Sequence, residues 1–314
     1  MTDTDPAGSG PPVVAVVGPT ATGKSDLAVA LACRFGGEVI NADSMQLYSG
    51  MDIGTAKLPE TERQGIPHHL LDVWSISTSA AVAEYQALAR AAIADIRGRG
   101  RIPVLVGGSG LYVRGVLDRL EFPGESPEIR NRLVAELEIH GAEALHARLQ
   151  TLDRAAAESI LPTNGRRVMR ALEVIELTGR KFTATMPGFE SIYPCVQIGL
   201  DREDLDDRVR RRVYRMMNRG LLDEVRTLLS EGLRASPTAS KALGYQQLLA
   251  VLDANGVLVG DLDAAVELTV RGTLRFVRRQ RSWFRRDPRV QWLDGASARL
   301  PDAAGAVLAP TLRL

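Results

Sequence analysis

Residues 18–25 have the types and spacing of a phosphate-binding loop. Their sequence, Gly-Pro-Thr-Ala-Thr-Gly-Lys-Ser, fits the pattern G-x-x-x-x-G-K-[ST] in full. An apolar run, 13–17, precedes the loop and a helix-favouring run, 26–32, follows it. This order of strand, glycine turn and helix lets backbone N–H groups surround a phosphate. It predicts phosphate binding by Gly18, Pro19, Thr20, Ala21, Thr22, Gly23, Lys24 and Ser25.

Lys24 and Ser25 have separate chemical roles in such a loop. The Lys24 ammonium can reach the outer phosphate oxygens, and the Ser25 hydroxyl, where the helix opens, can hold Mg²⁺. A glycine-rich turn without a ligand is the alternative explanation. The loop alone does not tell whether the phosphates belong to a nucleotide.

Asp43 follows the second predicted strand, 38–41, at the sheet edge where the phosphate loop is also expected. A carboxylate there can act as a general base. The pattern also allows a Mg²⁺ ligand, or an N-cap for the next turn.

The third predicted strand, 103–106, continues into Gly107-Gly108-Ser109 without an acidic residue. ATPases with this loop commonly carry an aspartate there, which positions Mg²⁺. Its absence weakens an ATPase interpretation and favours a transferase in which Ser109 contacts the substrate. A serine in a glycine-rich turn can also serve the turn alone.

Arg208 and Arg212 lie one helical turn apart in an arginine-rich segment. Their guanidinium groups can converge on one anion, so both are candidates for binding a diphosphate. Acidic neighbours within 201–207 leave open a solvated helix face held by ion pairs.

Short strands alternating with helices would position these residues. Besides the strands already named, we predict strands over 196–200 and 290–293. This alternation predicts an α/β fold, with a P-loop-type parallel sheet, helices on both of its faces, and ligands at the carboxyl ends of the strands.

The strand pattern stops over 118–194, where apolar residues recur at helical spacing, as in Ile129, Leu133 and Leu137. We therefore predict a helical insertion domain over 118–194. The core is predicted over 13–117 and 195–314, including C-terminal helices, and a disordered tail over 1–12.

The composition is that of a soluble globular protein with no overall attraction for nucleic acid. The 314 residues include 39 Lys and Arg against 38 Asp and Glu, and 45% are hydrophobic. No apolar run is long enough for a membrane span, and none resembles a signal peptide. The two cysteines, Cys33 in a predicted core helix and Cys195 in a predicted strand, predict neither a disulfide framework nor a metal site. We expect a cytoplasmic monomer.

Five motifs are combined in this sequence. They are 18–25, Asp43-Ser-Met-Gln-Leu-Tyr48, Met51-Asp-Ile-Gly-Thr-Ala-Lys57, 101–110 and Leu243-Gly-Tyr245. Together they resemble the bacterial tRNA dimethylallyltransferase family, also called tRNA isopentenyltransferases. The resemblance extends from about residue 13 to residue 293.

The resemblance implies transfer of a dimethylallyl group from dimethylallyl diphosphate to N6 of the adenosine just 3′ of the anticodon in tRNA. Asp43 matches the general base of the family. The loop would stabilise the pyrophosphate leaving group, together with Lys24 and with Mg²⁺ on Ser25. Of the two arginines, Arg212 is the better match for this role. Ser109 stands where the family usually has threonine, so the hydroxyl is kept and the methyl group is absent.

The resemblance also implies contacts with the anticodon stem and loop of tRNA. The target adenine has to leave its stack to expose N6, and Gln46 could hydrogen-bond it there. The residues that match tRNA contacts of the family are Asp43, Ser44, Met45, Gln46, Ser109, Arg130, Arg166, Arg167, Val168, Met169, Arg170, Lys241, Gly244, Tyr245 and Gln246.

The densest basic stretch, 271–289, contains eight arginines and one acidic residue. On a helix, Arg275, Arg278, Arg279, Ser282 and Arg286 would share a face that can follow an RNA backbone. The aromatic residues of this stretch are expected in the core.

Two other classes of protein share part of this pattern. One is a nucleotide-dependent small-molecule or nucleoside kinase, in which Asp43 would activate a hydroxyl. The other is a non-catalytic RNA-binding regulator that keeps the loop as a nucleotide switch. The D-S-x-Q-x-Y motif argues against the kinase, and the intact set of Asp43, Lys24 and Ser25 argues against the regulator.

Overall fold

The computed structural model describes residues 10–182 and 188–312. The chain divides into two units, which we describe separately: the core unit, Met1–Arg119 with Ser191–Leu314, and the helical unit, Leu120–Glu190. The tail predicted over 1–12 lies outside the described residues up to residue 9.

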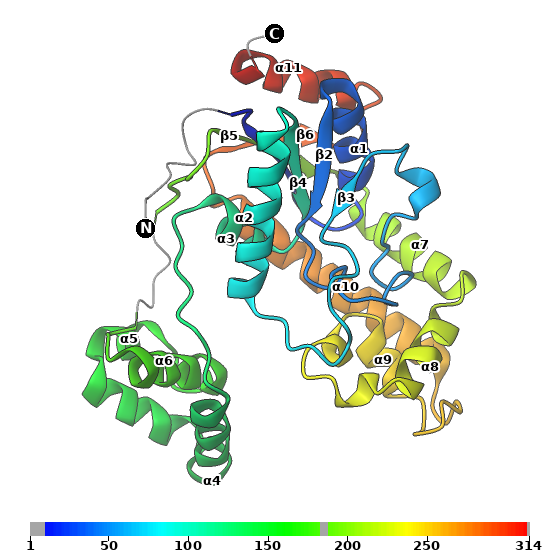
Figure 1. The fold of residues 1–314 in the computed structure, drawn as a ribbon. Helices are drawn as coiled ribbons and strands as arrows, with labels where there is room; N and C mark the ends of the chain where they lie inside the picture. The colour runs from blue at the N-terminus through cyan, green and yellow to red at the C-terminus, as the bar shows by residue number, and fades with distance from the viewer. Residues whose placement is uncertain (1–9, 183–187, 313–314) are drawn as a thin grey trace. The chain divides into compact units, whose positions relative to one another are not determined.

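A six-stranded parallel sheet forms the centre of the core unit (Figure 1), in the spatial order β3-β2-β4-β1-β5-β6. Its strands are β1 (Val13–Val17), β2 (Gly37–Asn41), β3 (His68–His69), β4 (Ile102–Gly107), β5 (Cys195–Asp201) and β6 (Val290–Asp294). Every pairing between these strands is parallel, so their carboxyl ends meet at one edge of the sheet. The predicted α/β fold is confirmed.

Helices cover both faces of this sheet because its central strand is apolar throughout. Alternate side chains of β1 belong to two buried clusters, one that contains Val13 and one that contains Val14. Helices α2 and α3 contribute to the Val13 cluster, and helices α1 and α11 to the Val14 cluster. The helices of the core unit are α1 (Lys24–Phe35), α2 (Val82–Gly98), α3 (Gly110–Leu117), α7 (Leu205–Asn218), α8 (Leu221–Ser230), α9 (Tyr245–Leu249), α10 (Leu262–Phe284) and α11 (Leu300–Leu312), with the short 3₁₀ turns η1 (Glu60–Glu62), η2 (Leu233–Ala235) and η3 (Ala239–Lys241).

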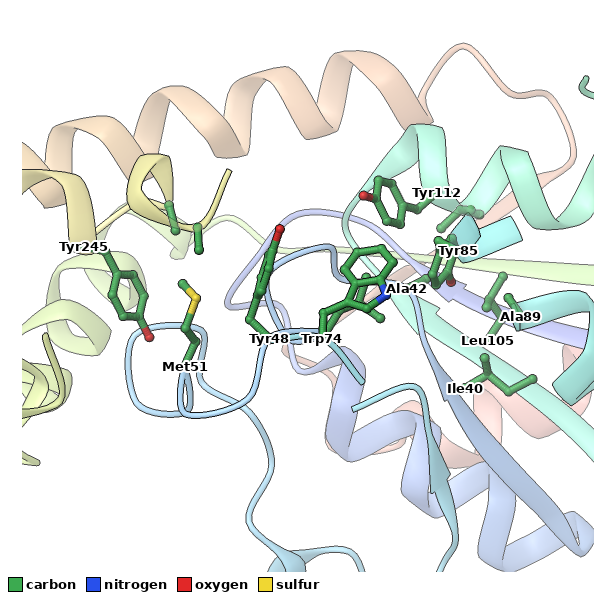
Figure 2. Close-up of a cluster of buried hydrophobic side chains, with 14 of the residues drawn as sticks. Ile40, Ala42, Tyr48, Met51, Trp74, Tyr85, Ala89, Leu105, Tyr112 and Tyr245 are labelled. Atoms are coloured by element: carbon green, nitrogen blue, oxygen red, sulfur yellow. The ribbon is translucent and has the colours of Figure 1, made fainter. Parts of the chain in front are cut away.

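Aromatic side chains support the segment that follows β2 (Figure 2). The Tyr85 hydroxyl donates a hydrogen bond to the carbonyl of Asn41, the last residue of β2 (2.8 Å). Tyr48 and Trp74 pack edge to face, with ring centroids 5.9 Å apart. The chain around Asp43 therefore rests on a packed apolar base.

The helical unit has its own hydrophobic core. It consists of α4 (Pro127–Leu152), α5 (Arg154–Ser159) and α6 (Gly165–Thr178). Leu133 of α4 packs with Val168 and Leu172 of α6, at the helical spacing expected from the sequence. The Ser126 hydroxyl caps α4 by accepting a hydrogen bond from the backbone N–H of Ile129 (3.3 Å).

Some local expectations are corrected. Strand β3 was not predicted, because two residues show no alternation. Helix α1 is a core helix as predicted, but Cys33 lies on its exposed side. Helix α10 ends at Phe284, so Arg286 does not continue the helical face of Arg275. Among the described residues, no helix combines the length and the apolarity needed to cross a membrane.

Candidate active site

The phosphate loop connects β1 to α1 and has a backbone that requires its glycines. Gly18 has φ 127°, and a Cβ atom there would lie 2.4 Å from the carbonyl oxygen of Leu200. Gly23 has φ 94° and precedes the first residue of α1. The Thr22 hydroxyl closes the loop by donating to the carbonyl of Pro19 (2.9 Å). Pro19 has no N–H group, so it contributes shape and no phosphate donor.

A cationic cavity of about 310 Å³ adjoins this loop. The loop contributes Ala21, Gly23, Lys24 and Ser25 to its wall, and α7 contributes arginines. The arginines are spaced by three or four residues, with 208, 212 and 215 on one face of α7 and 219 just after its last residue. The structure thus brings the predicted Arg208 and Arg212 to Lys24.

The α7 face extends beyond the two arginines that we predicted. Arg215 and Arg219 also line the cationic cavity, and their spacing from Arg212 was the signal that could have identified them. Asp26 and Glu62 line the same cavity, and burial together with the charge of Glu62 raises the pKa of Asp26.

The pKa values of Lys24 and Arg212 are both lowered in this cavity. Burial and the nearby charge of Arg212 lower the pKa of Lys24 to about 7, and Asp43 partly opposes this shift. Burial also lowers the pKa of Arg212, which donates a hydrogen bond to the carbonyl of Thr55 (3.3 Å). The Lys24 ammonium donates to the carbonyl of Pro19 (2.5 Å). A bound anion would relieve this accumulation of positive charge.

A second, largely apolar cavity of about 280 Å³ lies next to the first, and Arg212 and Met216 line both. Its polar side includes Asp43, Ser109 and Lys241. Its apolar side includes Val209, Val213, Leu221, Leu243 and Phe276. Asp43 therefore faces an apolar space whose neighbour is cationic.

Asp43 is held by bonds on both sides. The Asn41 side chain accepts a hydrogen bond from the backbone N–H of Asp43 (2.9 Å) and donates one to its carbonyl (3.0 Å). One carboxylate oxygen of Asp43 accepts from the N–H of Met45 (2.9 Å), the turn contact that the sequence allowed. The Ser109 hydroxyl accepts from the N–H of Ser44 (3.2 Å), which joins the ends of β2 and β4.

Glu224 of α8 is a structural anchor that sequence reasoning missed. Its carboxylate accepts hydrogen bonds from the N–H groups of Asp52 (3.1 Å), Ile53 (2.7 Å) and Gly54 (3.1 Å). It also accepts one from the Tyr245 hydroxyl (2.6 Å). No local pattern indicates these bonds, because 170 residues or more separate Glu224 from the loop.

The predicted tRNA-binding residues of the core unit occupy different positions. Ser44, Met45, Lys241 and Gly244 line the apolar cavity, and Gln246 is exposed. The Gln46 side chain instead donates to the carbonyl of Thr55 (3.1 Å). Tyr245 is fully buried, so it exposes no surface that could contact RNA.

In the helical unit, buried Glu173 connects two of the predicted residues. Its carboxylate accepts hydrogen bonds from Arg130 (2.7 Å) and Arg170 (2.9 Å). Arg166 and Arg167 are exposed, and Met169 is half-buried. Val168 is fully buried in the core of the unit, which leaves its side chain no access to RNA.

Within the described residues, no group of three or more His, Cys, Asp or Glu side chains could hold a metal ion. The Ser25 hydroxyl and the carboxylates of Asp26 and Glu62 are the metal-compatible groups that line the cationic cavity.

Comparisons with known proteins show which family this chain resembles. Residues 46–287 match the family model described as IPP transferase. The tRNA dimethylallyltransferase of Streptomyces avermitilis is 62% identical over 296 residues, which cover 93% of each chain. That of Acidothermus cellulolyticus is 60% identical over 299 residues, which cover 94% of this chain and 93% of the relative.

Solved structures show the same similarity. The full-length tRNA isopentenylpyrophosphate transferase of Bacillus halodurans has 41% identity and a TM-score of 0.71, over 96% of this chain and 97% of its own. A eukaryotic dimethylallyltransferase acting on tRNA has 27% identity and a TM-score of 0.81, over 95% of this chain and 78% of its own.

Proposed function

The chain belongs to the IPP transferase family, and we propose that it transfers a dimethylallyl group from dimethylallyl diphosphate to tRNA. The acceptor is N6 of the adenosine 3′-adjacent to the anticodon, and the product is N6-dimethylallyladenosine. The observation that carries this proposal is the adjacency of an apolar cavity containing Asp43 to a cationic cavity containing Lys24.

The two cavities suit the two halves of the donor. The diphosphate would occupy the cationic cavity, bound by the N–H groups of 21–25, by Lys24, and by Arg208 and Arg212. The dimethylallyl group would extend past Arg212 and Met216 into the apolar cavity, where the flipped adenine meets it.

The reaction forms one bond and breaks one. N6 of the adenine attacks C1 of the dimethylallyl group, and the bond from C1 to the diphosphate oxygen breaks. The Asp43 carboxylate takes the proton from N6, and pyrophosphate leaves with the electron pair. Lys24 and the arginines stabilise the charge that collects on the leaving oxygen. Ser109, which orders the chain beside Asp43, would contact the base or the diphosphate.

The donor set of the cationic cavity fits a Mg²⁺ ion that is bound mainly by the diphosphate and water. Ser25 would supply one hydroxyl ligand. Such an ion would neutralise charge on the leaving group.

For tRNA, we propose that Asp43, Ser44, Met45, Ser109, Lys241 and Gly244 surround the flipped base, with Gln46 and Gln246 beside them. Arg130, Arg166, Arg167, Met169 and Arg170 of the helical unit would contact the anticodon stem, whereas Val168 packs in the core of that unit. Both cavities are lined by one chain, so we propose that the protein acts as a monomer. Because its substrate is tRNA, we propose that it acts in the cytoplasm.

Incubation of the purified protein with labelled dimethylallyl diphosphate and tRNA, and in parallel with ATP, tests the proposal. We expect label in tRNA, and mass spectrometry of digested tRNA should find N6-dimethylallyladenosine as the only new nucleoside. ATP consumption without prenylated tRNA would instead support the kinase alternative, which the named relatives do not favour.

A further inference from the structure

Gln280 of α10 is a buried amide that connects two loops of the site. The residue is 4% exposed. The Oε1 atom accepts a hydrogen bond from the backbone N–H of Thr20 (2.9 Å), and Nε2 donates one to the carbonyl of Gly108 (2.9 Å). Because both ends of the amide are used, its orientation is fixed.

The two loops carry the opposite sides of the proposed reaction. Thr20 belongs to the phosphate loop. Gly108 precedes Ser109, whose N–H donates to the carbonyl of Ala42 (3.4 Å) and whose hydroxyl accepts from the N–H of Ser44 (3.2 Å). Ala42 and Ser44 flank Asp43, so a single side chain links the leaving-group loop to the segment that holds the general base.

The close approach of α10 depends on glycines at the end of β4. A Cβ atom at Gly108 would lie 2.2 Å from Nε2 of Gln280, and one at Gly110 would lie 2.1 Å from Cδ1 of Trp283. Only glycine therefore allows Gln280 to reach between the loops.

The hydrogen bond between Thr20 and Gln280 also separates the phosphate loop into two parts, which line different cavities. The N–H of Thr20 is engaged by Gln280, and Thr20 lines the apolar cavity, whereas Ala21, Gly23, Lys24 and Ser25 line the cationic one. The diphosphate donors thus lie beyond the residue that Gln280 holds.

We propose that Gln280 is a positioning residue that sets the distance between the reacting carbon of the donor and the base held at Asp43. This inference rests on the proposed function. Gln280 lines neither of the two cavities described, so it acts through the loops. Rate falls steeply with misplacement of reacting groups, by about 100-fold for about 1 Å.

The first test is Gln280→Met, which keeps the volume and removes both hydrogen bonds. We expect kcat at saturating substrates to fall by roughly 10- to 100-fold, while KM for dimethylallyl diphosphate stays within about threefold of the wild-type value. The matched control is Gln197→Met, because Gln197 is equally buried in β5 but lies beside Asp287 and Arg289. The control should lower thermal stability and leave kcat unchanged.

A second variant, Gln280→Glu, keeps the inference testable if the first does not fold. A protonated glutamic acid can still accept from Thr20 and donate to Gly108, whereas the carboxylate cannot donate. The ratio of its kcat to that of the wild type should therefore rise as the pH falls. A wild-type kcat in folded Gln280→Met, or a ratio independent of pH, would overturn the role of Gln280. An inactive wild-type enzyme would overturn the proposed function instead.

Discussion

Asp43 and Lys24 have environments that match two different tasks. Asp43 lines the apolar cavity, where a neutral adenine would be deprotonated, and Lys24 lines the cationic cavity, where an anion would leave. Burial and Arg212 lower the pKa of Lys24 to about 7. Substitutions at these two positions therefore separate proton transfer from binding of the leaving group.

Asp43→Asn should lower kcat by about 10²- to 10⁴-fold, because the variant has no general base. The asparagine keeps the oxygen that accepts the N–H of Met45, so the turn should survive. Single-turnover prenylation with both substrates saturating measures the effect. Asp223→Asn, at an exposed aspartate that pairs with Arg226, is the control. Unchanged turnover in Asp43→Asn would exclude Asp43 as the base.

Binding of dimethylallyl diphosphate should be accompanied by proton uptake at about pH 8. Free Lys24 has a pKa of about 7 and is mostly neutral at that pH, and a bound diphosphate raises the pKa of Lys24. Titration calorimetry in buffers with different ionisation enthalpies measures the uptake. It should disappear in Lys24→Met and decline toward pH 6, where Lys24 is already protonated. Equal heats in all buffers at pH 8 would contradict this assignment.

At the scale of elements, helix α8 shapes the wall between the two cavities. Gly54 and Thr55 line the apolar cavity, while Ile53, Ala56 and Lys57 line the cationic one. Glu224 of α8 holds this loop by three backbone N–H groups. The loop therefore depends on a helix far away in the sequence.

Glu224→Gln should lower the free energy of unfolding by about 1–3 kcal/mol, because an amide NH₂ would face N–H donors of the loop. KM for dimethylallyl diphosphate should rise as Thr55 and Arg212 shift.

Tyr245→Phe removes one of the four hydrogen bonds to Glu224 and should lower the free energy of unfolding by about 0.5–1.5 kcal/mol. Urea unfolding and steady-state kinetics measure both effects. Glu231→Gln, at the exposed end of α8, serves as the control, and equal stability of Glu224→Gln and this control would refute the anchor.

Across the whole molecule, positive and negative charges nearly cancel, with a net charge of +1. A tRNA must therefore be bound by local patches and not by the overall field. On α10, Arg275, Arg278 and Arg279 are exposed. By contrast, Arg281 and Arg285 form ion pairs with Asp201, which gives them a structural role.

Arg278→Ala with Arg279→Ala should weaken tRNA binding and flatten its dependence on salt. The logarithmic slope should decrease by about 0.7–0.9 for each phosphate that these arginines no longer neutralise. Fluorescence anisotropy of labelled tRNA across a potassium chloride series measures the slope. Arg34→Ala with Arg299→Ala, at exposed arginines that line neither cavity, removes the same charge elsewhere. If both double variants keep the wild-type slope, the arginines of this α10 face have a structural role and do not bind tRNA.

Much of the fold and part of the site could be predicted because they depend on neighbours in the chain. The phosphate loop, its strand and its helix occupy adjacent residues, and Asp43 closely follows β2, which ends at Asn41. Since carboxyl ends of parallel strands share an edge, these local patterns were enough to place Asp43 near Lys24.

The tertiary structure alone decided which residues hold the site in shape. Gln280 lies in a stretch whose arginines indicated RNA binding, and its partner Thr20 is 260 residues away. Glu224 and Tyr245 likewise serve a loop that no local pattern connects to them. A sequence specifies local backbone through short-range sterics and periodicity, whereas the partner of a buried polar side chain depends on which helix packs against which loop.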